Sequence, residues 1–346
     1  MKKSLKSFSF ILFIAFSLFI FTNVSAQNPS GYHLLKKIEI GGEGGWDYLF
    51  ADADGHRLYV SHSTKIVVVD TESATVIGEI TNLKGVHGVA VVKKFGRGFI
   101  SDGRDNSVVI FDLKTFKTLD TVKVGKNPDC IMYDTTTKHI FAFNRGDSNV
   151  SAIDAASGKV VGTLELDGHP EFAQADGKGM IFVNIDNKSE VVAFDAKTLT
   201  IKNRWAIAPG EDNSGLAIDR KNHRLFIVCD NKKMVVMNYD NGKIVAELSI
   251  GEGTDAAAFD PNTNLVFSSN GECNMTIVRE DSKDKYSVVE TITTQRGART
   301  MTIDTKTHKL YLATAQFGET PVPTKENPRP RPTIVPNSFV ILVYGK

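Results

Sequence analysis

The chain has 346 residues, of which 41 are Lys or Arg and 40 are Asp or Glu, with 41% hydrophobic residues. A charge so close to neutral argues against broad, sequence-independent nucleic-acid binding, which depends on many phosphate-neutralising Lys and Arg side chains. The three cysteines are an odd number without close spacing, which argues against a disulfide framework.

Residues 1–26 have the pattern of a secretory signal peptide. Three lysines precede an apolar run from Phe8 to Phe21, and Val24-Ser25-Ala26 provides the small residues of a cleavage site. The run is short for a membrane span, and no other segment reaches the length of one. We therefore expect an exported protein, periplasmic or extracellular, that begins at Gln27 and has no transmembrane segment. Removing those three lysines from the 41 basic residues leaves 38 against 40 acidic ones, a formal charge of −2, which argues against nucleic acid as a partner.

A segment of about 42 residues then repeats roughly seven times. The first strand of each repeat ends 40, 42, 42, 43, 41 and 44 residues after the previous one. These expected inner strands are Asp47–Asp52, His87–Val92, Asp129–Asp134, Glu171–Asp176, Ser214–Asp219, Asp255–Asp260 and Arg299–Asp304. Repeats of about 40–45 residues with four strands each are typical of β-propellers.

The second strand of every repeat carries an aromatic residue in the same position. These residues are Tyr59, Phe99, Phe141, Phe182, Phe226, Phe267 and Tyr311. We expect each ring to fill the wedge between neighbouring blades, where a large rigid group buries the most area. The third strands are rich in β-branched residues, as strands prefer.

The last repeat has only three strands, whereas Tyr32–Ile40 has the pattern of an outer strand without a repeat of its own. We therefore predict that this N-terminal strand completes the last blade and removes an open sheet edge. The predicted fold is all-β: one seven-bladed propeller domain over residues 27–346, with four antiparallel strands per blade. A Pro-rich insertion, residues 317–337, interrupts the last blade.

The first side chains of the inner strands should converge at one mouth of the central channel. They are Asp47, His87, Asp129, Glu171, Ser214, Asp255 and Arg299. This ring suits a small polar ligand or a divalent cation. Its oxygen ligands favour Ca²⁺ or Mg²⁺, and the addition of a histidine favours Zn²⁺ or Mn²⁺. Metal ligands, if the protein has them, are expected among Asp47, His87, Asp129, Glu171 and Asp255. The alternative is a solvated funnel in which water and Arg299 balance the charges.

The Pro-rich insertion should leave from the same face as the ring. It could lie over the channel mouth, with Arg329 and Arg331 near the carboxylates, or serve as an arm that docks a partner. The alternative is a solvated excursion without a binding role. Arg145-Gly146-Asp147 matches an adhesion tripeptide, but its position in the repeat indicates an ordinary turn.

Several segments look like degenerate YVTN motifs: Tyr59-Val60-Ser61-His62, Phe141-Ala142-Phe143-Asn144 and Phe267-Ser268-Ser269-Asn270. Asn127-Pro128-Asp129 and His169-Pro170-Glu171 look like the strand-opening signature of the same family. The chain therefore resembles the YVTN-repeat, YncE-like seven-bladed propellers of exported bacterial proteins. This resemblance implies the fold, while propellers in general host binding, scaffolding and catalysis.

We interpret the chain as an exported propeller that binds a small polar ligand or a protein partner through its channel-mouth face, most simply as a monomer. No phosphate-binding loop, nucleophile elbow, catalytic cysteine or haem motif is present in the sequence, so no catalytic residue is assigned. The alternative is a metal-dependent, lactonase-like hydrolase, in which a divalent cation held by the ring polarises a carbonyl or activates water.

Overall fold

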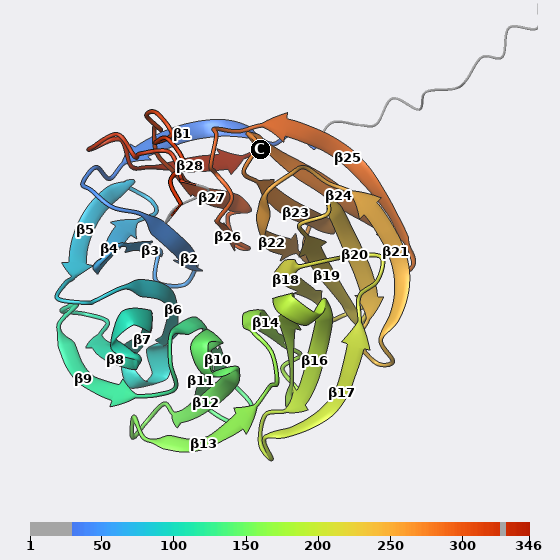
Figure 1. The fold of residues 1–346 in the computed structure, drawn as a ribbon, viewed down its shortest axis with the longest axis horizontal. Helices are drawn as coiled ribbons and strands as arrows, with labels where there is room; N and C mark the ends of the chain where they lie inside the picture. Colours follow the sequence, from blue (N-terminus) through green and yellow to red (C-terminus); the bar gives the residue numbers. More distant parts are fainter. Residues whose placement is uncertain (1–29, 326–329) are drawn as a thin grey trace, which may run out of the picture.

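The computed structural model describes residues 30–325 and 330–346. Within these ranges the chain forms seven four-stranded antiparallel sheets arranged around a central axis, as the seven-bladed propeller predicted from the repeat (Figure 1). The predicted signal peptide lies outside the described residues. No helix in the described part of the chain has the length and hydropathy needed to cross a bilayer.

The two strands nearest the axis in each blade follow the predicted repeat. The inner strands are β2 (Trp46–Asp52), β6 (Val86–Val92), β10 (Pro128–Asp134), β14 (Pro170–Ala175), β18 (Asn213–Asp219), β22 (Thr254–Asp260) and β26 (Met301–Asp304). The second strands are β3 (Arg57–His62), β7 (Arg97–Asp102), β11 (His139–Asn144), β15 (Met180–Ile185), β19 (Arg224–Cys229), β23 (Leu265–Asn270) and β27 (Lys309–Thr314).

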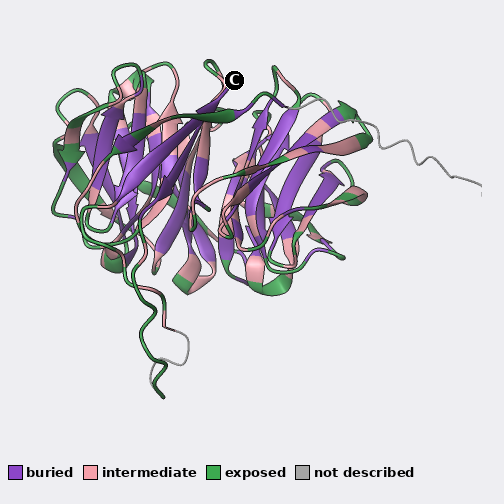
Figure 2. Ribbon diagram, turned by 90° about the horizontal axis from the view of Figure 1, so that it is seen from above, coloured by how far each residue is buried: buried purple, intermediate pink, exposed green. Residues whose placement is uncertain are grey.

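The outer half of each blade is a hairpin that runs from the core to solvent. The third strands are β4 (Lys65–Asp70), β8 (Ser107–Asp112), β12 (Asn149–Asp154), β16 (Glu190–Asp195), β20 (Lys233–Asn238), β24 (Asn274–Ser282) and β28 (Val340–Gly345). The fourth strands are β5 (Thr75–Ile80), β9 (Thr118–Lys123), β13 (Val160–Glu165), β17 (Thr200–Ala206), β21 (Lys243–Ser249), β25 (Lys285–Thr293) and β1 (His33–Glu39). Figure 2 shows the buried interior of the disc and its exposed edges and faces.

Four short 3-10 helices are described, and three of them connect the second and third strands of successive blades. These three are η2 (Gly103–Asp105), η3 (Arg145–Asp147) and η4 (Asp186–Lys188), whereas η1 (Lys93–Phe95) follows an inner strand. Each of the three ends in a residue with positive φ: Asn106, Ser148 and Ser189. This tight left-handed turn returns the chain into the third strand and leaves the side chains of the helix on the loop face.

The N-terminal strand closes the ring as predicted. β1 pairs antiparallel with β28, from His33 opposite Gly345 to Glu39 opposite Val340, which gives the last sheet the order β1-β28-β27-β26. Tyr32 and Ile38 are each 4% exposed against this blade, and the Tyr32 hydroxyl donates to the His308 carbonyl oxygen at 3.0 Å. The last blade is therefore built from both ends of the chain.

The aromatic wedge is confirmed in all seven blades. The seven rings are 0–1% exposed. Tyr59 packs in a cluster with Val86, Val89 and Ile100 of the next blade, and Tyr311 packs in a cluster with Leu58 of the first blade. Each ring thus contributes to an interface between blades, which is where the hydrophobic core of this molecule lies.

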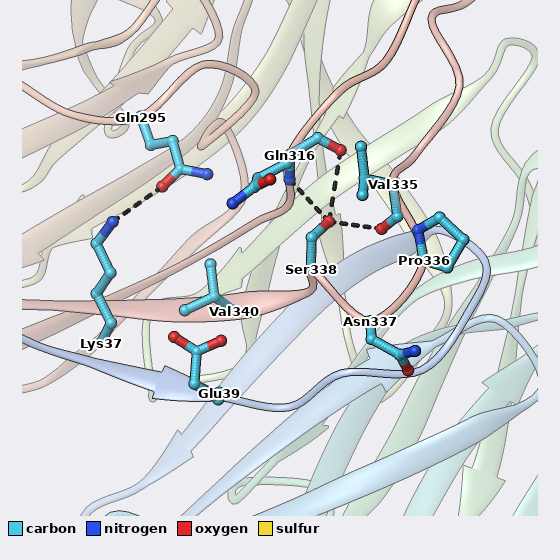
Figure 3. Close-up of a pocket in the computed structure, with 9 residues that line it drawn as sticks. All are labelled: Lys37, Glu39, Gln295, Gln316, Val335, Pro336, Asn337, Ser338 and Val340. Carbon is cyan, nitrogen blue, oxygen red and sulfur yellow. Dashed lines mark hydrogen bonds between the residues drawn. The ribbon is translucent and has the colours of Figure 1, made fainter.

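The insertion begins as a short extension of the last blade. Phe317 forms an isolated bridge with Ile334, and the Gly318 amide donates to the Thr333 carbonyl oxygen at 2.8 Å. At its base, the Ser338 hydroxyl accepts a hydrogen bond from the Gln316 amide at 2.9 Å and donates to the Val335 carbonyl oxygen at 2.6 Å (Figure 3). These residues lie beside a surface pocket of about 270 Å³ that Lys37 and Glu39 of β1 also line, and their contacts join the two legs of the insertion at its base.

A buried pair of carboxyl groups, Glu280 on β24 and Asp219 at the end of β18, lies between the fifth and sixth blades. They are 4% and 3% exposed. Burial raises the pKa of Glu280 to about 7, and the charge of Asp219 and a hydrogen bond with it add to the shift, whereas hydrogen bonds from Asn222 and Tyr286 oppose it. The native fold therefore favours the protonated form of Glu280.

We expect Glu280→Gln to become more stable relative to the native sequence as the pH rises from about 5 to about 7, and to keep a constant advantage above that. Because the pKa of Glu280 is raised from 4.5 to about 7 in the folded state, its contribution is fully present below pH 4.5 and is lost as the pH rises through 7. The change with pH in the difference between their free energies of unfolding should reach at most about 3 kcal/mol. Urea unfolding at several pH values measures it, with the exposed Glu247→Gln as control. Parallel pH profiles for Glu280→Gln and the native protein would contradict the prediction.

Candidate functional site

The predicted ring residues lie where the inner strands leave the regular sheet. In six blades the pairing between the first and second strands shifts register directly after the first residue of the inner strand, as between Trp46 and Leu49 and between Pro128 and Ile131. Asp47 and Asp129 fall inside these irregular segments, as do the ring residues of the other four blades. A bulge of this kind re-aims side chains and is common beside functional sites.

Side chains of the second strands hold these irregular segments in place. The Ser61 hydroxyl accepts from the Asp47 amide at 2.9 Å. The Ser101 hydroxyl accepts from the Gly88 amide at 2.8 Å and donates to the Asp129 carbonyl oxygen of the next blade at 2.5 Å. Ser61 and Ser101 occupy the same position in their repeats, two residues after the aromatic residue of the second strand, so this position supports the backbone of the ring.

Three of the predicted residues meet on the first three blades. The His87 Nδ1 atom lies 2.5 Å from Asp47 Oδ2 and 3.5 Å from Asp129 Oδ1. One ligand atom from each of the three residues lies within 4.8 Å of the others, so this trio could hold a metal ion. The His87 ring rests against Gly103, where an added Cβ would come within 2.6 Å of Nε2. This packing turns Nδ1 toward the two carboxylates.

Glu171 joins a second cluster that was not predicted. Arg145 on η3 bonds Glu171 through Nη1 and Asp186 on η4 through Nη2, the latter at 2.5 Å. His169 Nδ1 lies 3.7 Å from the second oxygen of Asp186. The interpretation of Arg145-Gly146-Asp147 as a turn without a role was therefore incomplete: the segment is a turn, but its arginine reaches the mouth. The position of Arg145 directly after a second strand, on the same face as the ring, could have indicated this role from the sequence.

The remaining three predicted residues are less tightly gathered. Asp255 forms a long ion pair with Arg299, with Nη1 and Oδ1 3.9 Å apart. The expected inner strand Arg299–Asp304 is shorter than predicted, because Arg299 lies in a turn in which its amide bonds the Gly297 carbonyl oxygen, and β26 begins at Met301. The Ser214 hydroxyl donates to the Thr254 carbonyl oxygen at 3.4 Å, a contact with the neighbouring strand rather than with a charged group.

Three carboxyl groups of the mouth, those of Asp129, Glu171 and Asp255, have raised pKa values. Burial raises the pKa of Asp129 and of Glu171 well above the usual carboxyl range, and each is raised further by neighbouring carboxylates. Burial also raises the pKa of Asp255 to about 6, against the opposing charges of Arg299 and Arg331. Burial alone would lower the pKa of His87, but the hydrogen bond to Asp47 and the surrounding negative charge raise it to about 9. A positive charge bound among these carboxyl groups would favour their ionised forms.

Beneath the ring, two aromatic side chains meet across the channel. Tyr48 of the first blade and Phe172 of the fourth blade have ring centroids 4.6 Å apart. The channel forms a cavity of about 670 Å³ that all seven inner strands line with largely apolar residues, including Phe50, Met132 and Phe259. The polar mouth therefore sits above an apolar chamber.

The stem of the insertion is beside the mouth, as predicted, but its described part does not cover it. The ring centroids of Phe317 and Trp46, the residue before Asp47, are 6.2 Å apart. The Arg296 guanidinium lies 5.6 Å from the Phe317 ring centroid. Figure 2 shows the insertion running away from the face of the disc. Arg329 lies outside the described residues, whereas Arg331 still acts on Asp255 through its charge.

Comparisons with known proteins support the architecture. Residues 55–209 match the model of a family described as a domain of unknown function, DUF5074. No curated protein matches the chain. A solved structure described as Kuenenia stuttgartiensis hydrazine synthase is 16% identical, with a TM-score of 0.69 over 78% of this chain and 92% of that one. The structure of U3-55K is 12% identical, with a TM-score of 0.72 over 91% of this chain and 99% of that one. At these identities the likeness shows a shared propeller fold.

Proposed function

We propose that this protein is a ligand-binding module whose channel mouth takes the positively charged group of a small polar ligand or of a protein partner. The observation that carries the proposal is a set of largely buried carboxyl groups gathered at one mouth, those of Asp129, Glu171 and Asp255, whose pKa values are raised by burial. Burying carboxylates together is costly unless something neutralises them. A bound cation would supply that neutralisation, and the bulged strands hold the carboxyl groups ready for it.

Carboxyl groups outnumber cationic side chains among the contacts of the mouth. These contacts join five carboxyl groups, those of Asp47, Asp129, Glu171, Asp186 and Asp255, to the cationic side chains of His87, Arg145 and Arg299. His169, beside Asp186, adds a further basic group. The stem of the insertion provides an aromatic surface next to the mouth, at Trp46 and Phe317, where a larger ligand or partner could extend its contacts.

A panel of cationic probes tests the proposal: spermidine, arginine methyl ester, lysine methyl ester, Ca²⁺, Mn²⁺ and Zn²⁺. We expect at least one probe to raise the unfolding temperature and to bind by calorimetry. Asp129→Ala combined with Glu171→Ala should weaken that binding about tenfold or more, because both acceptors are lost. Asp105→Ala combined with Asp147→Ala removes two carboxylates from loops on the same face and serves as the matched control. Equal loss in both double variants, or no binding by any probe, would refute the proposal.

A second candidate function is a metal-dependent, lactonase-like hydrolase. It is favoured by the Asp47, His87 and Asp129 trio together with Glu171, a carboxyl group whose pKa is raised by burial and which could act as general acid. Hydrolysis of simple lactones by the Mn²⁺- or Zn²⁺-loaded protein, abolished by Asp129→Asn, would support it. Binding without turnover leaves the ligand-binding module as the function.

We further propose that the protein is exported to the periplasm or beyond and belongs with the YVTN-repeat propellers. The signal-like segment 1–26 and the degenerate tetrads support this, and an N-terminus at Gln27 in the protein recovered from cells would test it. We also propose that nucleic acid is not its partner, since residues 27–346 have a formal charge of −2 and carboxyl groups outnumber cationic side chains at the mouth. Duplex binding at physiological salt, with a steep salt dependence, would overturn that statement.

A further inference from the structure

The Asp47, His87 and Asp129 trio stands out from the other ion pairs of the mouth because it combines one imidazole with two carboxylates. We propose that it is a binding site for a single first-row transition-metal dication of the zinc type. The inference rests on the proposed role of the mouth in binding positive charge, and it names one ligand class and three ligand atoms within it. These atoms are His87 Nδ1, Asp47 Oδ2 and Asp129 Oδ1.

The spacing of the three atoms is close to that of a metal site. Bonds of about 2.0–2.2 Å to a tetrahedral ion place neighbouring ligand atoms roughly 3.3–3.6 Å apart. His87 Nδ1 and Asp129 Oδ1 are already 3.5 Å apart. His87 Nδ1 and Asp47 Oδ2, at 2.5 Å, would need to separate by about 1 Å, and the Asp47 side chain, 30% exposed, has room to move.

An unsatisfied carboxylate oxygen points to a ligand independently of the cluster itself. Asp129 is 8% exposed, and its Oδ1 atom is buried and accepts no hydrogen bond in the described part of the chain. Buried polar atoms without a partner are uncommon in native proteins and mark strain, function or an absent ion. The buried Tyr48 hydroxyl below it also has no hydrogen-bond partner among the described residues. A metal ion bonded to Oδ1 would satisfy the first of these groups.

The donor set favours a zinc-type ion over calcium. An imidazole nitrogen suits zinc and similar ions, whereas calcium takes six to eight oxygen ligands. Three protein ligands leave the coordination sphere open to water or to a donor atom of a ligand at the mouth. The fixed orientation of the His87 ring against Gly103 favours such a preformed site.

Titration of the tag-free protein with Zn²⁺, Mn²⁺ and Ca²⁺ after chelator treatment tests the site. We expect one Zn²⁺ per chain by calorimetry and elemental analysis, with tighter binding than Ca²⁺. His87→Gln and Asp129→Asn should each weaken Zn²⁺ binding about tenfold or more. Co²⁺ should give an absorption band that His87→Gln alters, which reports direct nitrogen ligation. Asp240→Asn, from the exposed His223–Asp240 pair at 2.9 Å, is the control and should bind Zn²⁺ normally.

The variants are nearly isosteric, and circular dichroism will establish that they fold. Asp47→Asn, at the more exposed position, provides a second variant if Asp129→Asn is unstable. The inference is wrong if the native protein binds no Zn²⁺, or if Zn²⁺ binding survives loss of two of the three ligands. If organic cations bind in a manner that depends on Asp129 and Glu171 while metals do not, the metal site is refuted and the proposed function stands. If neither class binds, both are refuted.

Discussion

Deleting residues 30–40 is expected to lower the unfolding midpoint by more than about 10 °C. The deletion removes β1, leaves β28 as an open edge and exposes the surface that Tyr32 and Ile38 bury. Loss of two such side chains alone amounts to several kcal/mol. Thermal unfolding followed by circular dichroism measures the effect. The exposed β28 edge should also promote self-association, which light scattering detects.

A matched pair of variants on β1 separates closure from general damage to the strand. Ile38→Ala, at a position 4% exposed, should cost about 2–5 kcal/mol, whereas Leu35→Ala, at a position 40% exposed, should cost much less. Equal effects of the two substitutions, or an unchanged midpoint after deletion of the strand, would show that β1 is not needed for the ring.

Phe226→Ala is expected to destabilise the protein by about 3–5 kcal/mol, because it empties one wedge between blades. Phe226 is fully buried, and its ring centroid lies 5.3 Å from that of Phe259 and 5.9 Å from that of Tyr286. The cost reflects the lost apolar surface and a cavity that the rigid neighbouring sheets cannot close. Urea unfolding measures it.

Two further substitutions make the wedge prediction specific. Phe226→Leu should lose less stability than Phe226→Ala, since it keeps most of the buried volume. Val161→Ala on the outer strand β13, where Val161 is 53% exposed, should stay within about 0.5 kcal/mol of the native protein. If Phe226→Ala behaved like Val161→Ala, the aromatic position would not be the element that joins the blades.

The fold could be predicted from the sequence because its determinants are local and repeated. An aromatic residue recurs in the second strand of each repeat, which predicts seven blades. The strand pattern at residues 32–40 has no repeat of its own, which predicts that this strand closes the ring. The structure differs from the predicted strand boundaries at one turn of the last blade. Arg299 was expected to begin an inner strand, but Gly297, with a φ of 77°, turns the chain there and delays β26 to Met301.

The site was predictable only in part, because it depends on contacts between different blades. The position of Asp47, His87 and Asp129 at the starts of inner strands placed them at one mouth. That His87 would lie between the two carboxylates depends on the bulges and on the packing of its ring against Gly103, which no repeat pattern reveals. Arg145 was missed because it comes from a loop of the third blade and acts on Glu171 and Asp186 of the fourth.

The pairing of β1 with β28 also sets the order of events during folding. His33 meets Gly345, a residue 312 positions later, whereas the strands of the first six blades pair with strands close by in the chain. Closing so long a loop costs on the order of 5 kcal/mol in chain entropy, which preassembled blades reduce. Blades can therefore form one by one as the chain is made, but β1 must wait without a partner until β28 emerges. A chain that stops before β28 therefore cannot reach the closed state.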